Sequence, residues 1–185
     1  EKAMNSDKML DKRHAEKMQK KKKARDKILS TKTLEKGLLI IHTGKGKGKS
    51  TAAMGLAIRA IGNGMKVGIV QFVKGVWETG ERKVLEKFPE LVTVKAMGEG
   101  FSWETQDRQR DIAAAEQAWR MSVAMMDDPS YKLIILDELN IPLRYGNLKI
   151  ENVLESLKEK RQSLHVVVTG RNAKEELIEM ADLVT

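Results

Sequence analysis

The sequence predicts an α/β fold, a mostly parallel β-sheet with helices on both faces, together with a basic N-terminal helix. Two observations predict the sheet: apolar segments of strand length alternate with segments of helical periodicity from residue 37 onward, and glycines or a proline separate many of them. A third predicts the helix: residues 1–36 contain 13 Lys and Arg, 6 Asp and Glu, and neither Gly nor Pro. We therefore expect a basic arm at residues 1–36 and one domain at residues 37–185.

Composition restricts the classes of protein and of site. Of the 185 residues, 41% are hydrophobic and 32% are charged, which is typical of a globular protein. The chain has no cysteine, so disulfides, thiolate zinc sites, iron–sulfur clusters and a cysteine nucleophile are excluded. No apolar run approaches the roughly 20 residues that a membrane-spanning helix needs, and no signal peptide is visible. We expect a cytoplasmic protein.

The basic arm carries most of the formal net charge of +8, because residues 37–185 contain 21 basic and 20 acidic residues. The run Lys20–Lys23 lies in this arm, which has few apolar residues. A solvated helix is one interpretation, and an arm that folds over a partner subunit or an anionic ligand is another. A nucleic-acid-binding arm is less favoured, because the arm has no aromatic residue for stacking and the domain has no basic excess to extend the surface.

The first elements of the domain are a strand, a helix and a second strand. The apolar run at 37–43 precedes a glycine-rich stretch, as a buried strand would. Residues 50–61 carry apolar side chains at helical spacing, and Gly62 and Gly64 end this helix. The apolar run at 67–72 predicts the next strand.

The middle of the domain continues the alternation. A short helix at 81–88 ends before Pro89, and residues 91–97 alternate as a strand does. Residues 105–126 predict a long helix, with Trp119 among the apolar side chains on one side.

The last third repeats strand and helix. An apolar run at 133–138 ends in two acidic residues and predicts a buried strand. A helix at 150–160, a strand at 166–169 and a helix at 173–180 follow. Residues 182–185 resemble the start of another strand, so we expect the domain to continue beyond Thr185.

A glycine-rich loop lies between the first strand and the first helix of the domain. Its glycines allow successive N–H groups to point at phosphate oxygens, and the helix adds the positive end of its dipole. Lys49 would contact phosphate oxygens, and Ser50 would offer a hydroxyl to Mg²⁺. The alternative is a flexible basic turn. The residues that we expect to bind ATP here are Thr43, Gly44, Lys45, Gly46, Lys47, Gly48, Lys49, Ser50 and Thr51.

One position departs from the strict phosphate-loop pattern, G-x-x-x-x-G-K-[ST]. The pattern requires glycine at position 43, where this chain has Thr43. The orientation of the nucleotide in the loop therefore stays open.

Two carboxylates follow the strand at 133–138. Asp137 and Glu138 would lie at the carboxyl edge of the sheet beside the phosphate loop, where open α/β sheets bind ligands. We expect Ser50, Asp137 and Glu138 to hold Mg²⁺, directly or through water; an acidic pair that caps the next turn is the alternative. With the loop, this pair predicts a phosphate-loop NTPase-like (RecA-like) fold that binds Mg-ATP.

Beyond nucleotide binding, six segments resemble the corrinoid adenosyltransferases of the CobA/BtuR/CobO type. In this sequence they are TGKGKGKST from Thr43, VQFVKG from Val70, GER from Gly80, GFSWET from Gly100, LDEL from Leu136 and TGR from Thr169. The resemblance covers residues 37–185 almost continuously, and GFSWET is its most specific element.

The resemblance implies a reaction: transfer of the 5′-deoxyadenosyl group of ATP to Co(I) of a corrinoid, with release of triphosphate. Reduced cobalt is a strong nucleophile, so the protein needs neither a nucleophilic side chain nor a general base. We assign the catalytic roles to Lys49, Ser50 and Glu138, which would hold ATP and stabilise charge on the triphosphate. Arg171, just after a strand, would also contact phosphate unless it is only a solvated side chain.

Two aromatic residues, Phe101 and Trp103, lie between glycines in an apparent loop. The resemblance implies that they bind the corrinoid and exclude the lower axial ligand of cobalt, which makes Co(II) easier to reduce; core packing is the alternative. It further implies a homodimer and an electron donor such as a flavodoxin or a flavin reductase. Whether the corrinoid is complete cobalamin or a precursor such as cobyrinic acid diamide stays open.

The sequence leaves two alternative functions open. A phosphate-loop ATPase or small-molecule kinase would use Glu138 to position water or a hydroxyl, and would release ADP. A nucleic-acid-binding module would use the basic arm, and its binding would depend steeply on salt.

Overall fold

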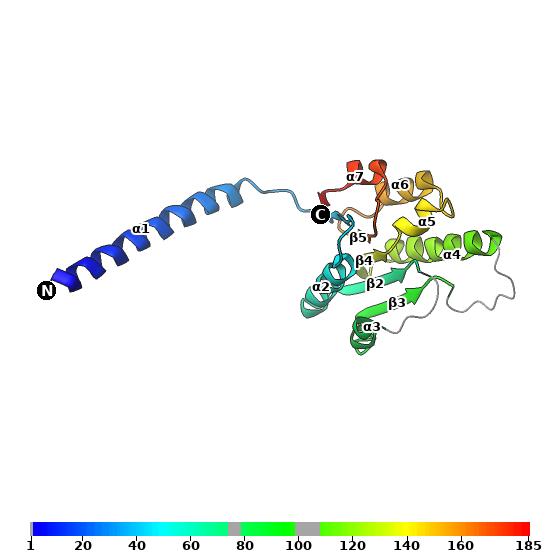
Figure 1. Cartoon of the computed structure of the whole chain (residues 1–185), viewed down its shortest axis with the longest axis horizontal. Coiled ribbons are helices and arrows are strands. Elements are labelled where there is room, and N and C mark those ends of the chain that lie inside the picture. The colour runs from blue at the N-terminus through cyan, green and yellow to red at the C-terminus, as the bar shows by residue number, and fades with distance from the viewer. Residues whose placement is uncertain (1, 74–78, 99–107) are drawn as a thin grey trace. The chain divides into compact units, whose positions relative to one another are not determined.

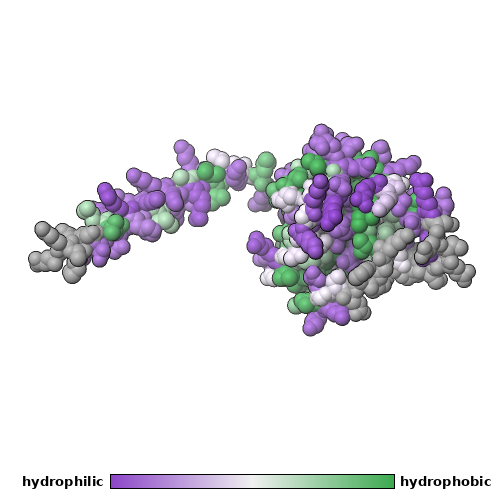
Figure 2. Space-filling view, viewed as in Figure 1, coloured by the Kyte–Doolittle hydropathy of each residue, from purple (hydrophilic) through white to green (hydrophobic). Residues whose placement is uncertain are grey.

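The computed structural model describes residues 2–73, 79–98 and 108–185. It divides the chain into two compact units, Glu1–Glu35 and Lys36–Thr185. The first unit contains one helix, α1 (Lys2–Ser30), and every side chain described in it, from residue 7 on, is exposed. Its surface is largely hydrophilic, with scattered apolar side chains such as Met9, Met18 and Ile28 (Figure 2).

The second unit is built on a six-stranded sheet in which every pair of neighbouring strands is parallel (Figure 1). The order across the sheet is β3-β2-β4-β5-β1-β6. The strands are β1 (Leu39–His42), β2 (Lys66–Gln71), β3 (Val92–Ala96), β4 (Tyr131–Asp137), β5 (His165–Thr169) and β6 (Leu183–Val184). The predicted α/β class is confirmed.

Six helices of the described residues flank this sheet. They are α2 (Lys49–Gly62), α3 (Gly80–Leu85), α4 (Arg108–Asp127), α5 (Asn140–Arg144), α6 (Ile150–Lys158) and α7 (Glu175–Met180). Because successive side chains of a strand point to opposite faces, each central strand contributes to two apolar clusters. Ile40 packs in the cluster that contains the buried side of α2, whereas Leu39 and Ile41 pack with α4, α6 and α7. Trp119 is buried in the latter cluster, as predicted.

The predicted elements are all present, and their ends differ in places. Helix α3 ends at Leu85 rather than 88, and α6 at Lys158 rather than 160. Helix α7 begins at Glu175 rather than 173, because Lys174 has an extended backbone and the Ala173 N–H bonds to a distant side chain. The helix α5 was not predicted. Residues 105–107, where we expected the long helix to begin, lie outside the described residues.

No helix in the described part of the chain is long and apolar enough to cross a membrane.

Candidate active site at the carboxyl edge of the sheet

The glycine-rich loop joins the end of β1 to the start of α2, as predicted. Gly44 and Gly48 have φ values of 100° and 102°, which side chains rarely adopt, so glycine is required at both positions. A Cβ atom built on Gly44, Gly46 or Gly48 would meet no atom within 4 Å. The space at these three Cβ positions is therefore open.

Helix α2 begins at Lys49 without any side chain capping its N-terminus. The N–H groups of its first turn have no partner within a helix, and its dipole is positive at this end. The Lys49 ammonium group lies across the loop, 3.0 Å from the Gly44 carbonyl oxygen and 2.5 Å from that of Gly46. Lys45, Lys47 and Thr51 are exposed nearby in sequence. The arrangement concentrates positive charge and N–H donors at one point.

Asp137 links the loop helix to two strands. Its Oδ1 atom accepts hydrogen bonds from the Ser50 hydroxyl and from the Thr169 hydroxyl, each at 2.7 Å. Thr169 in turn accepts the Glu138 N–H at 2.9 Å. The last residues of β4 and β5 and the first turn of α2 thus meet at one buried carboxylate. Thr169 was not assigned to the site from the sequence, although it begins the segment TGR and ends a predicted strand.

Glu138 follows directly, with a φ of 58°, an uncommon value for a residue with a side chain. Burial raises the pKa of its carboxyl, and the neighbouring Asp137 raises it further, while Lys49 and Arg171 oppose the shift. The structure brings Ser50 and Asp137 into contact, and the Asp137 carboxylate lies near enough to Glu138 to raise the pKa of that carboxyl. That these three residues hold a metal remains a prediction.

These donors fit a magnesium ion. Mg²⁺ is commonly held by one or two carboxylates with substrate phosphates and water, and a hydroxyl and two carboxylates are such oxygen ligands. A cation would also offset the repulsion that raises the Glu138 pKa. Among the described residues no group of three or more His, Cys, Asp or Glu side chains could hold a metal by itself, so phosphate oxygens would have to complete the coordination.

Arg171 lies in the connection between β5 and α7, which we call the β5–α7 connection (residues 170–174). Its side chain is exposed and lies near enough to Glu138 to lower the pKa of that carboxyl. The structure thus brings Arg171 to the acidic side of the site. Its contact with phosphate remains a prediction.

Two cavities open at this end of the second unit. One, of about 290 Å³, is lined by Ser50 and Asp137 together with Met54, Gln71, Val73, Thr79 and Glu81. The other, of about 530 Å³, is mainly apolar. Val73 lines both, so the cavity beside the phosphate loop adjoins the apolar one.

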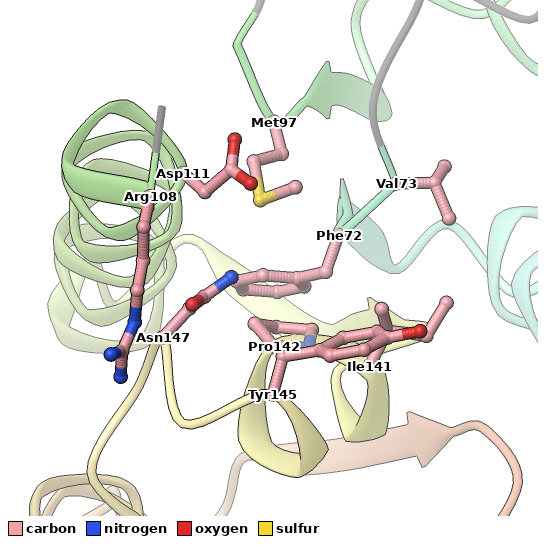
Figure 3. Close-up of a pocket in the computed structure, with 9 residues that line it drawn as sticks. All are labelled: Phe72, Val73, Met97, Arg108, Asp111, Ile141, Pro142, Tyr145 and Asn147. Carbon is pink, nitrogen blue, oxygen red and sulfur yellow. The ribbon is translucent and has the colours of Figure 1, made fainter. Parts of the chain in front are cut away.

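The larger cavity is shown in Figure 3. The ring of Phe72, which is fully buried, lies between Met97 on one side and Pro142 and Tyr145 on the other (Figure 3). Its lining comprises Phe72, Val73, Met97, Arg108, Asp111, Ile141, Pro142, Tyr145 and Asn147. None of these nine residues was assigned to the site from the sequence, and three of them, Ile141, Pro142 and Tyr145, belong to the unpredicted α5 and its C-terminal end.

The predicted corrinoid-binding residues Phe101 and Trp103 lie outside the described residues. Met97 and Arg108, which lie close to either end of the segment 99–107, both line the larger cavity.

Comparison with known proteins identifies the family. Residues 35–185 match the family model described as ATP:corrinoid adenosyltransferase BtuR/CobO/CobP. A corrinoid adenosyltransferase of a Sinorhizobium species is 54% identical over 177 residues, covering 95% of this chain and 83% of the relative. One from Pseudomonas aeruginosa is 50% identical over 182 residues, covering 98% and 90%, and one from Escherichia coli (strain K12) is 41% identical over 177, covering 96% and 89%. The chain therefore belongs to the ATP:corrinoid adenosyltransferase family, and it is an enzyme that transfers an adenosyl group to a corrinoid.

Proposed function

We propose that the chain transfers the 5′-deoxyadenosyl group of ATP to Co(I) of a corrinoid and releases triphosphate. One observation carries this proposal beyond the family: the phosphate loop and its acidic partner adjoin an apolar cavity, and Val73 lines both sides of the junction. If the phosphates of ATP lie at the loop, its nucleoside end would reach that junction.

The chemistry demands positioning rather than a reactive side chain. A filled orbital of Co(I) attacks C5′ of ATP, a cobalt–carbon bond forms, and the C5′–O bond breaks. The bonding electrons leave with the triphosphate, and the cobalt becomes formally Co(III). The protein must hold C5′ in line with cobalt and stabilise the charge that develops on the departing oxygen.

Three groups of this chain suit the triphosphate. The Lys49 ammonium contacts the Gly44 and Gly46 carbonyl oxygens of the loop, and the uncapped N-terminus of α2 begins at the same residue. Arg171 adds a second cation from the β5–α7 connection. Ser50, Asp137 and Glu138 would hold Mg²⁺, which when bound would neutralise part of the phosphate charge.

The apolar cavity has a volume of about 530 Å³, which would hold a drug-sized group but not a whole cobalamin. It therefore suits one face or one part of the corrinoid. Tyr145, which is exposed at this cavity, would pack on flat or apolar groups. From the family resemblance we keep Phe101 and Trp103 as residues that exclude the lower axial ligand. A homodimer, a flavodoxin or flavin reductase as electron donor, and a cytoplasmic location are further proposals from the same resemblance.

The test is to incubate the protein with Mg-ATP and chemically reduced cob(I)alamin. The expected result is a light-sensitive alkylcobalt spectrum with one triphosphate per turnover by chromatography. The Lys49→Ala variant should lose roughly 100-fold or more in rate, because it removes a charge from the leaving group. Lys132→Ala is the matched control, since Lys132 is exposed near the start of β4. Release of ADP or orthophosphate without an organocobalt product would identify an ATPase or kinase instead.

A second experiment separates the corrinoid site from the ATP site. Replacing both Phe101 and Trp103 by Ala should leave ATP affinity nearly intact and abolish adenosylation driven by a flavodoxin-type reductant. Unchanged activity with that reductant would show that the two aromatic residues do not act on the cobalt.

A further inference from the structure

The residue that departs from the phosphate-loop pattern has a specific contact. The Thr43 hydroxyl accepts a hydrogen bond from the backbone N–H of Ala173, 130 residues away, at 3.2 Å. Its own N–H donates to the Thr185 carbonyl oxygen at 2.8 Å. Thr43 is not among the residues with a positive φ, so the backbone there does not require the glycine of the common pattern. The side chain therefore joins the phosphate loop to the β5–α7 connection.

The same connection is held at its other end. The Asn140 side chain is 2% exposed, and its Nδ2 donates to the Gly170 carbonyl oxygen at 2.8 Å. The Gly170 N–H donates to the carbonyl oxygen of His42 at 3.1 Å. Gly170 has a φ of 137°, and a Cβ atom there would lie 2.8 Å from the Cβ of Asn140, so only glycine allows this close approach. Hydrogen bonds thus fix residues 170 and 173, on either side of Arg171.

We propose that Thr43 is a positioning residue that acts through Arg171: its hydroxyl fixes the β5–α7 connection so that the guanidinium is held beside the phosphate loop. This rests on the proposed binding of the ATP triphosphate at that loop. A cation held in place before the reaction need not be ordered when the ligand binds. Because the charge on the triphosphate grows as the C5′–O bond breaks, a preorganised Arg171 contributes more to kcat than to KM.

The test is a double-mutant cycle. Thr43→Val keeps the shape and removes the hydroxyl, Thr43→Ser keeps the hydroxyl, and Arg171→Ala removes the cation. We expect Thr43→Val to lower kcat about fivefold to tenfold, the usual effect of one hydrogen bond, with a smaller change in KM for ATP. Thr43→Ser should restore most of the loss. In the Arg171→Ala background, Thr43→Val should cause no further loss.

Thr93→Val is the matched control, because it removes a threonine hydroxyl that accepts a hydrogen bond from Tyr131 within the sheet, and its activity should equal that of the native chain. Independent losses from Thr43→Val and Arg171→Ala that multiply in the double variant would overturn the proposal, as would native activity of Thr43→Val. If the melting temperature of Thr43→Val is lower than that of the native chain, the same cycle is run with Thr43→Ala.

The same cycle is measured as binding of inorganic triphosphate by calorimetry, which needs no corrinoid. A native chain that binds triphosphate but forms no organocobalt product would contradict the proposed reaction alone. Additive effects on triphosphate affinity, in a native chain that does adenosylate cobalamin, would contradict the positioning role alone.

Discussion

At the scale of single residues, Gly46 has a different role from the other two glycines of the phosphate loop. Gly44 and Gly48 need glycine for their positive φ, whereas Gly46 is not among the residues with positive φ and its Cβ position is open. A methyl group at 46 would therefore meet no atom of the described chain, and it would lie within the loop that we expect to bind phosphate.

We predict that Gly46→Ala leaves the melting temperature unchanged or slightly higher, because alanine restricts the unfolded chain. ATP affinity should fall about tenfold or more, since overpacking costs about 1–3 kcal/mol. Thermal melting and calorimetric titration with Mg-ATP measure the two effects. Gly55→Ala, in the middle of α2 with equally open space, is the matched control and should leave affinity as it is. Native affinity in Gly46→Ala would show that phosphate does not approach this part of the loop.

A second prediction at this scale concerns pH. His165 accepts the Leu38 N–H at Nδ1, 3.1 Å away, so its neutral ring carries the proton on Nε2. Burial lowers the His165 pKa, and Lys160 lowers it further. Because the folded pKa lies below the unfolded value of 6.5, stability is full above about pH 6.5 and declines as the pH falls toward the folded pKa.

His165→Asn can accept the same hydrogen bond with its side-chain oxygen and does not titrate. The native chain should therefore lose stability relative to this variant between pH 7 and pH 5, as measured by urea unfolding at several pH values. Parallel curves for the two proteins over that range would exclude His165 as a source of acid sensitivity.

At this scale, the sequence allowed candidate site residues to be assigned where the residues are neighbours along the chain. Ser50 follows Lys49 in a known pattern, and Asp137 and Glu138 end an apolar run, so they could be assigned as site residues. Thr43, Thr169 and Asn140 act through partners that are distant in sequence, and only the parallel pairing of β1, β4 and β5 reveals those partners.

At the scale of elements, the length of a helix decided whether the sequence could predict it. Helix α4, with 20 described residues, has enough turns for an apolar periodicity to be clear. Helix α5 has only five residues and contains Pro142, so no period can be recognised in it. Two of its residues, Ile141 and Pro142, nevertheless line the larger cavity, and its first residue is Asn140.

The junction of α4 and β4 allows a test at this scale. Arg161 donates from Nε to the Met126 carbonyl oxygen at 3.1 Å, and from Nη2 to the carbonyl oxygens of Asp128 and Tyr131 at 3.0 and 2.8 Å. A cation at a helix C-terminus also interacts favourably with the helix dipole.

Arg161→Met should lower stability by about 2 kcal/mol, because three carbonyl oxygens lose a charged donor. In a chain of this size that corresponds to a fall of roughly 4–8 °C in melting temperature. Arg59→Met, on an exposed position of α2, should change the melting temperature little. Equal effects of the two variants would show that the contacts of Arg161 are not specific.

At the scale of the whole molecule, charge and apolar burial are separated along the chain. Among the residues whose burial the structure describes, every buried hydrophobic one lies between Leu39 and Leu177, whereas the arm contributes exposed side chains and most of the net charge. The composition of residues 1–36 allowed this division to be expected from sequence. The strand order β3-β2-β4-β5-β1-β6 was not predicted, because local patterns do not specify which strands are neighbours.

This separation predicts the outcome of deleting residues 1–35. Both apolar clusters and the whole described site remain in residues 36–185, so the melting temperature and triphosphate affinity should stay close to those of the full chain. If the arm folds over a partner subunit, as one interpretation of its sequence holds, and covers the active site there, corrinoid turnover should fall while triphosphate binding persists. The measurements are melting, calorimetry, adenosylation rate and sedimentation of both proteins. A full-length variant with Lys20–Lys23 changed to Gln distinguishes loss of charge from loss of the helix. A truncated chain that adenosylates corrinoid at the native rate as a monomer would exclude the covering role. A lower melting temperature of the truncated chain would show that the arm stabilises the fold.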